Sequence, residues 1–244
     1  MTAPAAQTPF TLAGYRTLVA GLLARGYSLR SFLAVEAAER HLLLRHDVDQ
    51  SITIARTMAD LETANGWYST WFILLRTEMY NPFSRANAAH LRTMAGNGHE
   101  IGLHLDTTLY ADDVQIEAGA AIECRMLEDI VGAPVRLISF HRPAPDRLGD
   151  DARVAGRLHA YMSRFTKDIG YCSDSRGEWR HGHPFDHPAI AQGRALQLLT
   201  HAVWWVGPEG RDARARLADV LTAKAAELDA ELAANNVVWA KGAG

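Results

Sequence analysis

Short apolar runs of strand length alternate with helical stretches along most of this 244-residue chain. The apolar runs are rich in leucine, β-branched or aromatic residues and are bounded by charge, glycine or proline, which is typical of buried strands. They cover residues 42–46, 67–75, 99–106, 135–140, 169–174 and 195–200. Helices are expected at residues 12–23, 51–65, 85–95, 111–131, 150–165 and 208–235. Strands that alternate with helices form a parallel sheet, and six such units predict an α/β barrel.

The bulk properties predict one globular domain and exclude several classes of partner. No repeat or linker divides the chain, so we expect a single domain over residues 1–244, with the first and last helices packed on the barrel. The net charge is −3, with acids and bases interleaved, which argues against nucleic-acid binding. No apolar run is long enough to span a membrane, and no secretory signal is recognisable, so we expect a cytoplasmic protein. Two cysteines, Cys124 and Cys172, are too few for a disulfide framework.

Almost every predicted strand ends in side chains that can take part in chemistry. The residues at these ends are Asp47 and Asp49, His104 and Asp106, His141 and Arg142, Asp174, and His201. The carboxyl ends of the strands form the active-site face of α/β barrels. The sequence therefore predicts one polar site assembled from five strand ends.

Asp47 and Asp49 follow the leucine-rich strand at residues 42–46. Side chains at alternate positions of an extended chain leave from the same face, so both carboxylates can overlook one cavity. Two such acids repel each other unless a cation or a shared proton lies between them. The alternative is that Asp49 caps the following helix together with Gln50 and Ser51.

Assembled in order, these residues resemble the motifs of the polysaccharide deacetylase family. Members of this family are metal-dependent carbohydrate esterases that remove N-acetyl or O-acetyl groups. The resemblance covers about residues 40–206 and includes five short motifs. They are the D-x-D form of the first motif at 47–49, a G-H-E-I-G-x-H segment at 98–104, Arg-Pro at 142–143, a segment with Asp and Trp at 174–179, and L-x-H at 199–201. Each motif alone is weak, but five in the family's order form a strong signal. The resemblance implies that the fold is a distorted, incomplete (β/α) barrel of the TIM type.

The resemblance also implies a role for each matched residue. Asp47 is similar to the general base, Arg142 to the arginine that holds this base ionised, and His201 to the general acid. Asp174 is similar to the acid of the fourth motif, and we expect it to orient His201. For Asp174 the alternative is a simple turn, and for His201 it is a packing role. The resemblance places Trp179 and Leu199 at the substrate, and Trp204 is expected either to stack on a sugar or to close the barrel.

The implied metal site departs from the family's pattern at one ligand. Asp49 and His104 match two metal ligands, but Thr108 stands where the family has a second histidine. His141 is the preferred third ligand because it ends a neighbouring strand, and Asp106 is the next choice. A site of nitrogen and oxygen ligands suits one Zn²⁺ ion, and Co²⁺, Ni²⁺ or Fe²⁺ would also fit.

The expected function is metal-dependent removal of a small acyl group, such as N-acetyl, from an amino sugar or a related small molecule. Two alternatives stay open. One is a catalytically silent protein that binds a saccharide or a partner protein on the same face, which the threonine at position 108 favours. The other is hydrolysis of a different C–N bond, such as a formamide or a cyclic ureide. The sequence leaves the oligomeric state open.

Overall fold

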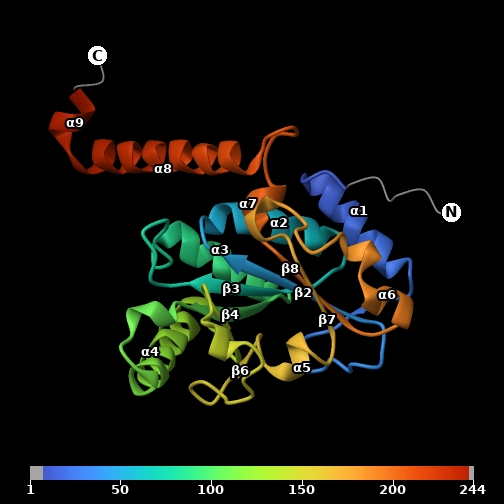
Figure 1. Cartoon of the computed structure of the whole chain (residues 1–244). Helices are drawn as coiled ribbons and strands as arrows, with labels where there is room; N and C mark the ends of the chain where they lie inside the picture. The colour runs from blue at the N-terminus through green and yellow to red at the C-terminus, as the bar shows by residue number, and fades with distance from the viewer. Residues whose placement is uncertain (1–7, 242–244) are drawn as a thin grey trace.

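The strands form one parallel sheet, as their alternation with helices predicts. The structure, a computed structural model, describes residues 8–241; residues 1–7, on which the expectation about a secretory signal partly rests, lie outside this range. The order of the strands is β6-β5-β4-β3-β2-β8-β7, with β1 beside β2. The strands are β1 (Ser28–Leu29), β2 (His41–Val48), β3 (Thr70–Leu74), β4 (Glu100–Leu105), β5 (Leu137–Phe140), β6 (Leu158–His159), β7 (Gly170–Ser173) and β8 (Leu196–Thr200). The sheet curls into a half-barrel (Figure 1). It stays open on one side because, within the described chain, the end strands β6 and β7 do not pair. The predicted incomplete (β/α) barrel is confirmed.

Helices surround this sheet, and polar side chains cap the starts of the longer ones. The helices are α1 (Leu12–Leu23), α2 (Ile52–Ala64), α3 (Arg85–Gly96), α4 (Asp113–Val131), α5 (Ser163–Thr166), α6 (Pro188–Gln192), α7 (Ala202–Trp205), α8 (Ala213–Asn235) and α9 (Val237–Lys241). Ser51 caps α2 by accepting a hydrogen bond from the backbone N–H of Ile54. Gly132 ends α4 in the left-handed conformation, which glycine adopts without steric cost.

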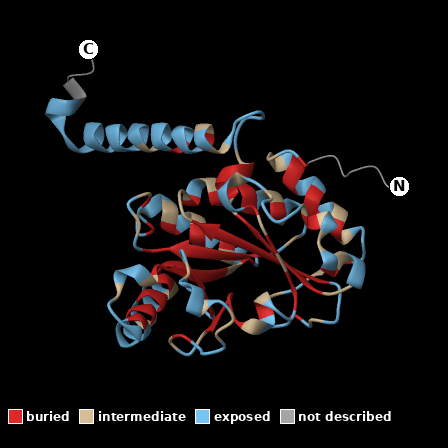
Figure 2. Cartoon of the chain, viewed as in Figure 1, coloured by how far each residue is buried: buried red, intermediate tan, exposed pale blue. Residues whose placement is uncertain are grey.

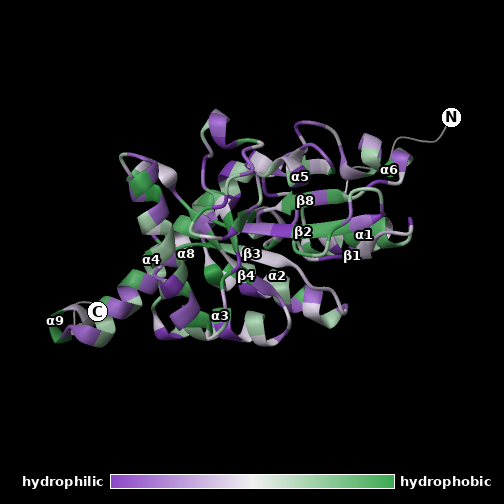
Figure 3. Ribbon diagram, turned by 90° about the horizontal axis from the view of Figure 1, so that it is seen from below, coloured by the Kyte–Doolittle hydropathy of each residue, from purple (hydrophilic) through white to green (hydrophobic). Residues whose placement is uncertain are grey.

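The two faces of β2 divide the molecule into an apolar layer and the floor of the site. Leu42 and Leu44 pack in the core beneath the surrounding helices, together with Trp71 of β3. On the opposite face Leu43 joins a second apolar cluster inside the half-barrel, and Arg45 follows it at alternate spacing. Figure 2 shows that the strands are buried almost throughout, and Figure 3 shows a hydrophilic stretch in β2. The inner face of β2 therefore changes from apolar to charged toward its carboxyl end.

The helix predicted at residues 150–165 is wrong. The segment contains an isolated bridge between Val154 and Arg157, the short strand β6 and only one turn of helix, α5. Gly156 and the preceding Ala155 both have a positive φ, which breaks a helical run. The short elements β1 and α6 were not predicted, because they are too brief to produce a recognisable period in the sequence.

Helix α8 begins against the body of the protein and then extends away from it (Figure 1). Its buried residues, Arg216 and Val220, both lie in its first turns, while Leu221, Leu228 and Leu232 are exposed. Most of α8 is thus exposed to solvent (Figure 2), whereas α1 buries one face with Tyr15, as expected of a helix packed on the sheet. None of the described helices combines the length and apolar character needed to cross a membrane.

Candidate metal centre

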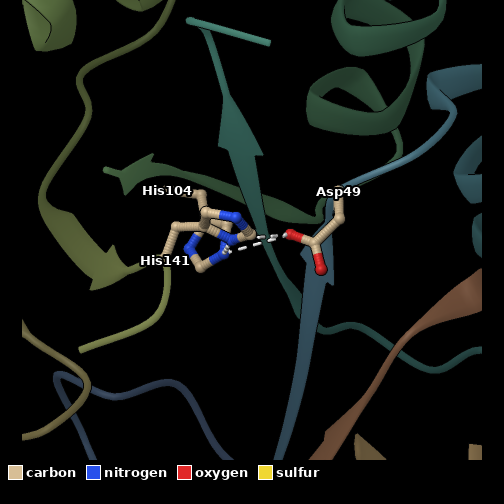
Figure 4. Close-up of side chains that lie close together, drawn as sticks. All are labelled: Asp49, His104 and His141. Atoms are coloured by element: carbon tan, nitrogen blue, oxygen red, sulfur yellow. Dashed lines mark hydrogen bonds and ion pairs between the residues drawn. The ribbon is translucent and has the colours of Figure 1, made fainter. Parts of the chain in front are cut away.

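Three side chains from different strand ends converge on one point (Figure 4). Asp49 follows β2, His104 lies on β4, and His141 follows β5. His104 Nε2 and His141 Nδ1 lie 3.2 and 3.3 Å from Asp49 Oδ1, and the two nitrogens lie 3.2 Å apart. Ligand atoms about 2.0–2.1 Å from a tetrahedral Zn²⁺ are separated from one another by roughly 3.3 Å. The three edges of the group therefore have the length that one tetrahedral ion requires.

The electrostatics of Asp49 also fit a cation. Its Oδ1 atom is buried and, within residues 8–241, no donor meets hydrogen-bond geometry with it, although both ring nitrogens are close. An orphaned carboxylate oxygen in the interior is costly unless a cation or a donor satisfies it. Burial alone would raise the pKa of Asp49, but the adjoining imidazoles of His104 and His141 lower it, so the carboxylate is ionised at neutral pH. Of the three residues that could cap the following helix, it is Ser51 that caps α2, so the cap role is wrong for Asp49.

The position occupied by Thr108 explains why Asp106 is not part of this group. Thr108 lies on a short 3₁₀ turn, and its hydroxyl and backbone N–H both donate to Asp106 Oδ1, at 2.6 and 3.0 Å. Asp106 Oδ2 accepts from Arg142 at 3.1 Å. Asp106 is therefore engaged by two neighbours, and of the two candidates for the third ligand it is His141 that joins Asp49 and His104.

Asp47 lies beside this group and is held by an arginine that sequence reasoning missed. Arg45 is fully buried, and its Nε and one terminal nitrogen donate to the two oxygens of Asp47 at 3.0 and 2.8 Å. Burial would raise the pKa of Asp47, but Arg45 holds it below its usual value. His104 Nε2 is 3.9 Å from Asp47 Oδ2, which places this ionised carboxylate next to the candidate metal site.

The predicted contact between Arg142 and Asp47 is wrong. The side chain of Arg142 is 70% exposed and pairs with Asp106 instead. Arg45 stands two residues before Asp47 in an extended strand, so the two side chains share a face. An arginine placed directly after a run of buried leucines was the signal that could have identified it, because a buried charge needs a partner.

His201 and Asp174 form a second ionic pair at the site. Asp174 is buried and accepts hydrogen bonds from His201 Nδ1 and from Trp205 Nε1, both at 2.7 Å. Burial opposes protonation of His201, but the Asp174 carboxylate outweighs it and raises the pKa of His201 to about 9. The free Nε2 atom of His201 lies 3.9 Å from Asp49 Oδ2. Asp174 thus orients an imidazolium toward the candidate metal site.

A cavity of about 710 Å³ opens above these groups. Leu199 and Trp204 line it as expected, together with Phe140, Tyr161 and Tyr171, which were not predicted. Trp179, which was also predicted to contact the substrate, is not among the residues that line this cavity. Its ring instead packs near Phe10 and Trp205, with ring centroids 5.9 and 6.0 Å away. The motif predicts that a tryptophan is present at this position, but it does not predict the direction in which the side chain points.

No protein-family model matches the sequence, and no curated protein matches it. Solved structures of similar shape include a family 4 carbohydrate esterase from Bacillus anthracis, at 16% identity and a TM-score of 0.46, which covers 86% of each chain. A family 4 pseudoenzyme from Bacillus anthracis matches at 13% identity and a TM-score of 0.41, covering 77% of this chain and 61% of the other. A mutant of a family 4 pseudoenzyme with restored enzymatic activity matches at 12% identity and a TM-score of 0.42, covering 79% of this chain and 65% of the other.

The chain thus spans slightly less than two thirds of the length of these two pseudoenzyme structures.

Proposed function

We propose that this protein is a metal-dependent hydrolase that removes a small acyl group, most simply acetyl, from an amino sugar or a related N-acylated compound. The observation that carries the proposal is the group of Asp49, His104 and His141, whose ligand atoms lie 3.2–3.3 Å apart beside an ionised carboxylate and an imidazolium. Two imidazoles and one carboxylate suit Zn²⁺ best, and Co²⁺, Ni²⁺ or Fe²⁺ would be alternatives.

Each part of amide hydrolysis would be carried out by a different group of residues at this site. A divalent ion held by Asp49, His104 and His141 would supply Lewis acidity toward the acyl carbonyl and the attacking water. Asp47, kept ionised by Arg45, would accept the proton of that water as general base. His201, held as an imidazolium by Asp174, would donate a proton to the departing amine.

The cavity walls support a small acyl group and a sugar-sized leaving group. Leu199 is buried and offers an apolar contact for a methyl group, while Trp204, Tyr161 and Tyr171 offer aromatic faces. A volume of about 710 Å³ is within the range of sites for small molecules. We therefore expect a soluble compound of a few sugar units or fewer.

The test is acetate release by Zn²⁺- or Co²⁺-loaded protein from a panel of N-acetylated, O-acetylated and N-formylated sugars. We expect release from at least one acetylated compound, and we expect Asp47→Asn and His201→Gln to lower the rate by roughly 10²-fold or more. Trp179→Phe is the matched control, because Trp179 lies outside the cavity lining, and its rate should stay unchanged. A metal-loaded protein that binds a saccharide without releasing acid would contradict the proposal and favour a binding role. Release of formate alone would favour hydrolysis of a different C–N bond.

A further inference from the structure

Three arginines from separate segments line the same cavity above the candidate metal site. Arg142 follows β5, Arg176 lies in the 3₁₀ turn Ser175–Gly177 after β7, and Arg214 lies in the first turn of α8. All three side chains are exposed. We refer to these three residues as the arginine rim. Their convergence is not a consequence of neighbouring positions in the sequence, because they come from three separate elements of the fold.

The backbone at two of these positions is strained. Only three non-glycine residues in the described chain have a positive φ, and two of them are Arg142 at 50° and Arg176 at 67°. A side chain in the left-handed region costs roughly 1–2 kcal/mol relative to glycine. Strain of this kind concentrates at ligand-binding sites, where the position of the side chain outweighs the cost.

The charge of the arginine rim is largely uncompensated. Arg142 pairs with Asp106 at 3.1 Å, but within residues 8–241 neither Arg176 nor Arg214 forms a salt bridge. Among the described residues, the acids that line the cavity are Asp47 and Asp49. Asp47 is paired with Arg45, and Asp49 belongs to the candidate metal group. A chain with a net charge of −3 thus places two guanidinium groups that form no salt bridge at the mouth of the cavity above the candidate metal site. Such a mouth attracts anions and increases their rate of encounter.

We propose that the arginine rim binds an anionic group, a phosphate or a carboxylate, that the acylated substrate carries. The guanidinium group suits both anions, because its planar fork of donors matches their oxygens. The cavity floor would then hold the acyl group while the rim holds the charge, so the preferred substrate is an acidic or phosphorylated N-acyl sugar rather than a neutral one. The hydrolysis of such a substrate rests on the proposed function, whereas the binding of its anionic group by the arginine rim does not.

The first test compares matched substrates of the metal-loaded full-length protein. N-acetylglucosamine, its 6-phosphate and N-acetylmuramic acid differ mainly in the anion, so the last two separate phosphate from carboxylate recognition. We expect kcat/KM to be about 10-fold or more higher for at least one anionic compound than for the neutral one, chiefly through KM, and to fall as salt rises. In the Arg176→Gln/Arg214→Gln variant this advantage should fall to about 3-fold or less. Arg16→Gln/Arg125→Gln removes the same charge from exposed positions outside the cavity, and the advantage should persist.

Calorimetric titration with the same compounds provides a readout that needs no turnover. Binding of an anionic compound that weakens about 10-fold in Arg176→Gln/Arg214→Gln, but not in the control variant, supports the rim even in a protein that hydrolyses nothing. An anion held only by the metal would bind both variants equally, and that result would overturn the inference. Equal kcat/KM for neutral and anionic substrates would also overturn it while leaving the proposed hydrolase intact.

Discussion

Replacing Arg45 by methionine tests the assignment that departs furthest from the sequence motifs. Besides its two bonds to Asp47, Arg45 donates to Ser139 Oγ at 2.6 Å, Tyr161 Oη at 3.0 Å and Gln197 Oε1 at 3.0 Å. In Arg45→Met the Asp47 carboxylate would stay buried, with the Ser139 hydroxyl as its remaining donor at 3.3–3.5 Å. Breaking one side of a buried ion pair costs about 3–5 kcal/mol. That is a large part of the roughly 5–15 kcal/mol by which a domain is stable.

The assay is urea unfolding at neutral pH, with Arg142→Met as the matched control. The two variants make the same chemical change, but Arg142 is 70% exposed, so its pair with the buried Asp106 is open to solvent on the arginine side. Asp106 also keeps its two hydrogen bonds from Thr108 when Arg142 is replaced. An ion pair that is open to solvent contributes about 0–1 kcal/mol. We therefore expect the loss of unfolding free energy to be at least about 2 kcal/mol greater for Arg45→Met than for Arg142→Met.

A double variant separates the ion pair from the other contacts of Arg45. Arg45→Met/Asp47→Leu removes both charges and leaves no carboxylate to bury. We expect it to be less destabilised than the sum of the two single variants, with a coupling energy of about 1–3 kcal/mol. Equal losses in Arg45→Met and Arg142→Met, or fully additive single variants, would refute the reasoning that Arg45 is the partner of Asp47.

Two further predictions concern groups outside the cavity. Glu62 is fully buried and accepts from Ser69 Oγ and His46 Nε2, at 2.6 and 2.9 Å; burial would raise its pKa, but His46, His99 and Ser69 lower it. Because the pKa of Glu62 is lower in the folded protein than in the unfolded one, its ionised carboxylate stabilises the fold at pH values above the unfolded pKa of about 4.3. We expect Glu62→Gln to cost about 1–3 kcal/mol of unfolding free energy at neutral pH, and this cost should shrink as the pH falls below about 4. Urea unfolding from pH 3 to pH 7 measures this, and a pH-independent cost would contradict it. Burial raises the pKa of the Cys124 and Cys172 thiols to about 12. We therefore expect both thiols to react with a thiol reagent at least about 10²-fold more slowly in the folded protein than in the protein unfolded in urea. Equal reaction rates would be inconsistent with the packing described.

The strands and the face on which the site lies could be predicted because they depend on local patterns. Runs such as Leu42 to Leu44 mark buried strands, and polar residues at strand ends of a parallel sheet must meet at one edge. Residues 150–165 could not be predicted in the same way, because their helix-like composition is overridden by the left-handed backbone at Ala155 and Gly156.

The partners within the site depended on directions that a linear motif does not record. The motifs named Arg142 as the partner of Asp47, yet its backbone has a φ of 50° and its side chain points to Asp106. Arg45 takes the place beside Asp47 that was expected for Arg142, because the alternation of side chains along a strand puts Arg45 and Asp47 on the same face. The choice between His141 and Asp106 likewise required the three-dimensional position of Thr108, whose hydroxyl engages Asp106.

The metal content of the purified protein tests the central claim most directly. Elemental analysis of the wild type should give about one transition-metal ion per chain, and Asp49→Ala, His104→Ala and His141→Ala should each lose it. Asp106→Ala is the control, because Asp106 lies outside the group of three, and it should keep the ion. A wild-type protein that is isolated without metal and does not bind added Zn²⁺ or Co²⁺ would contradict the account.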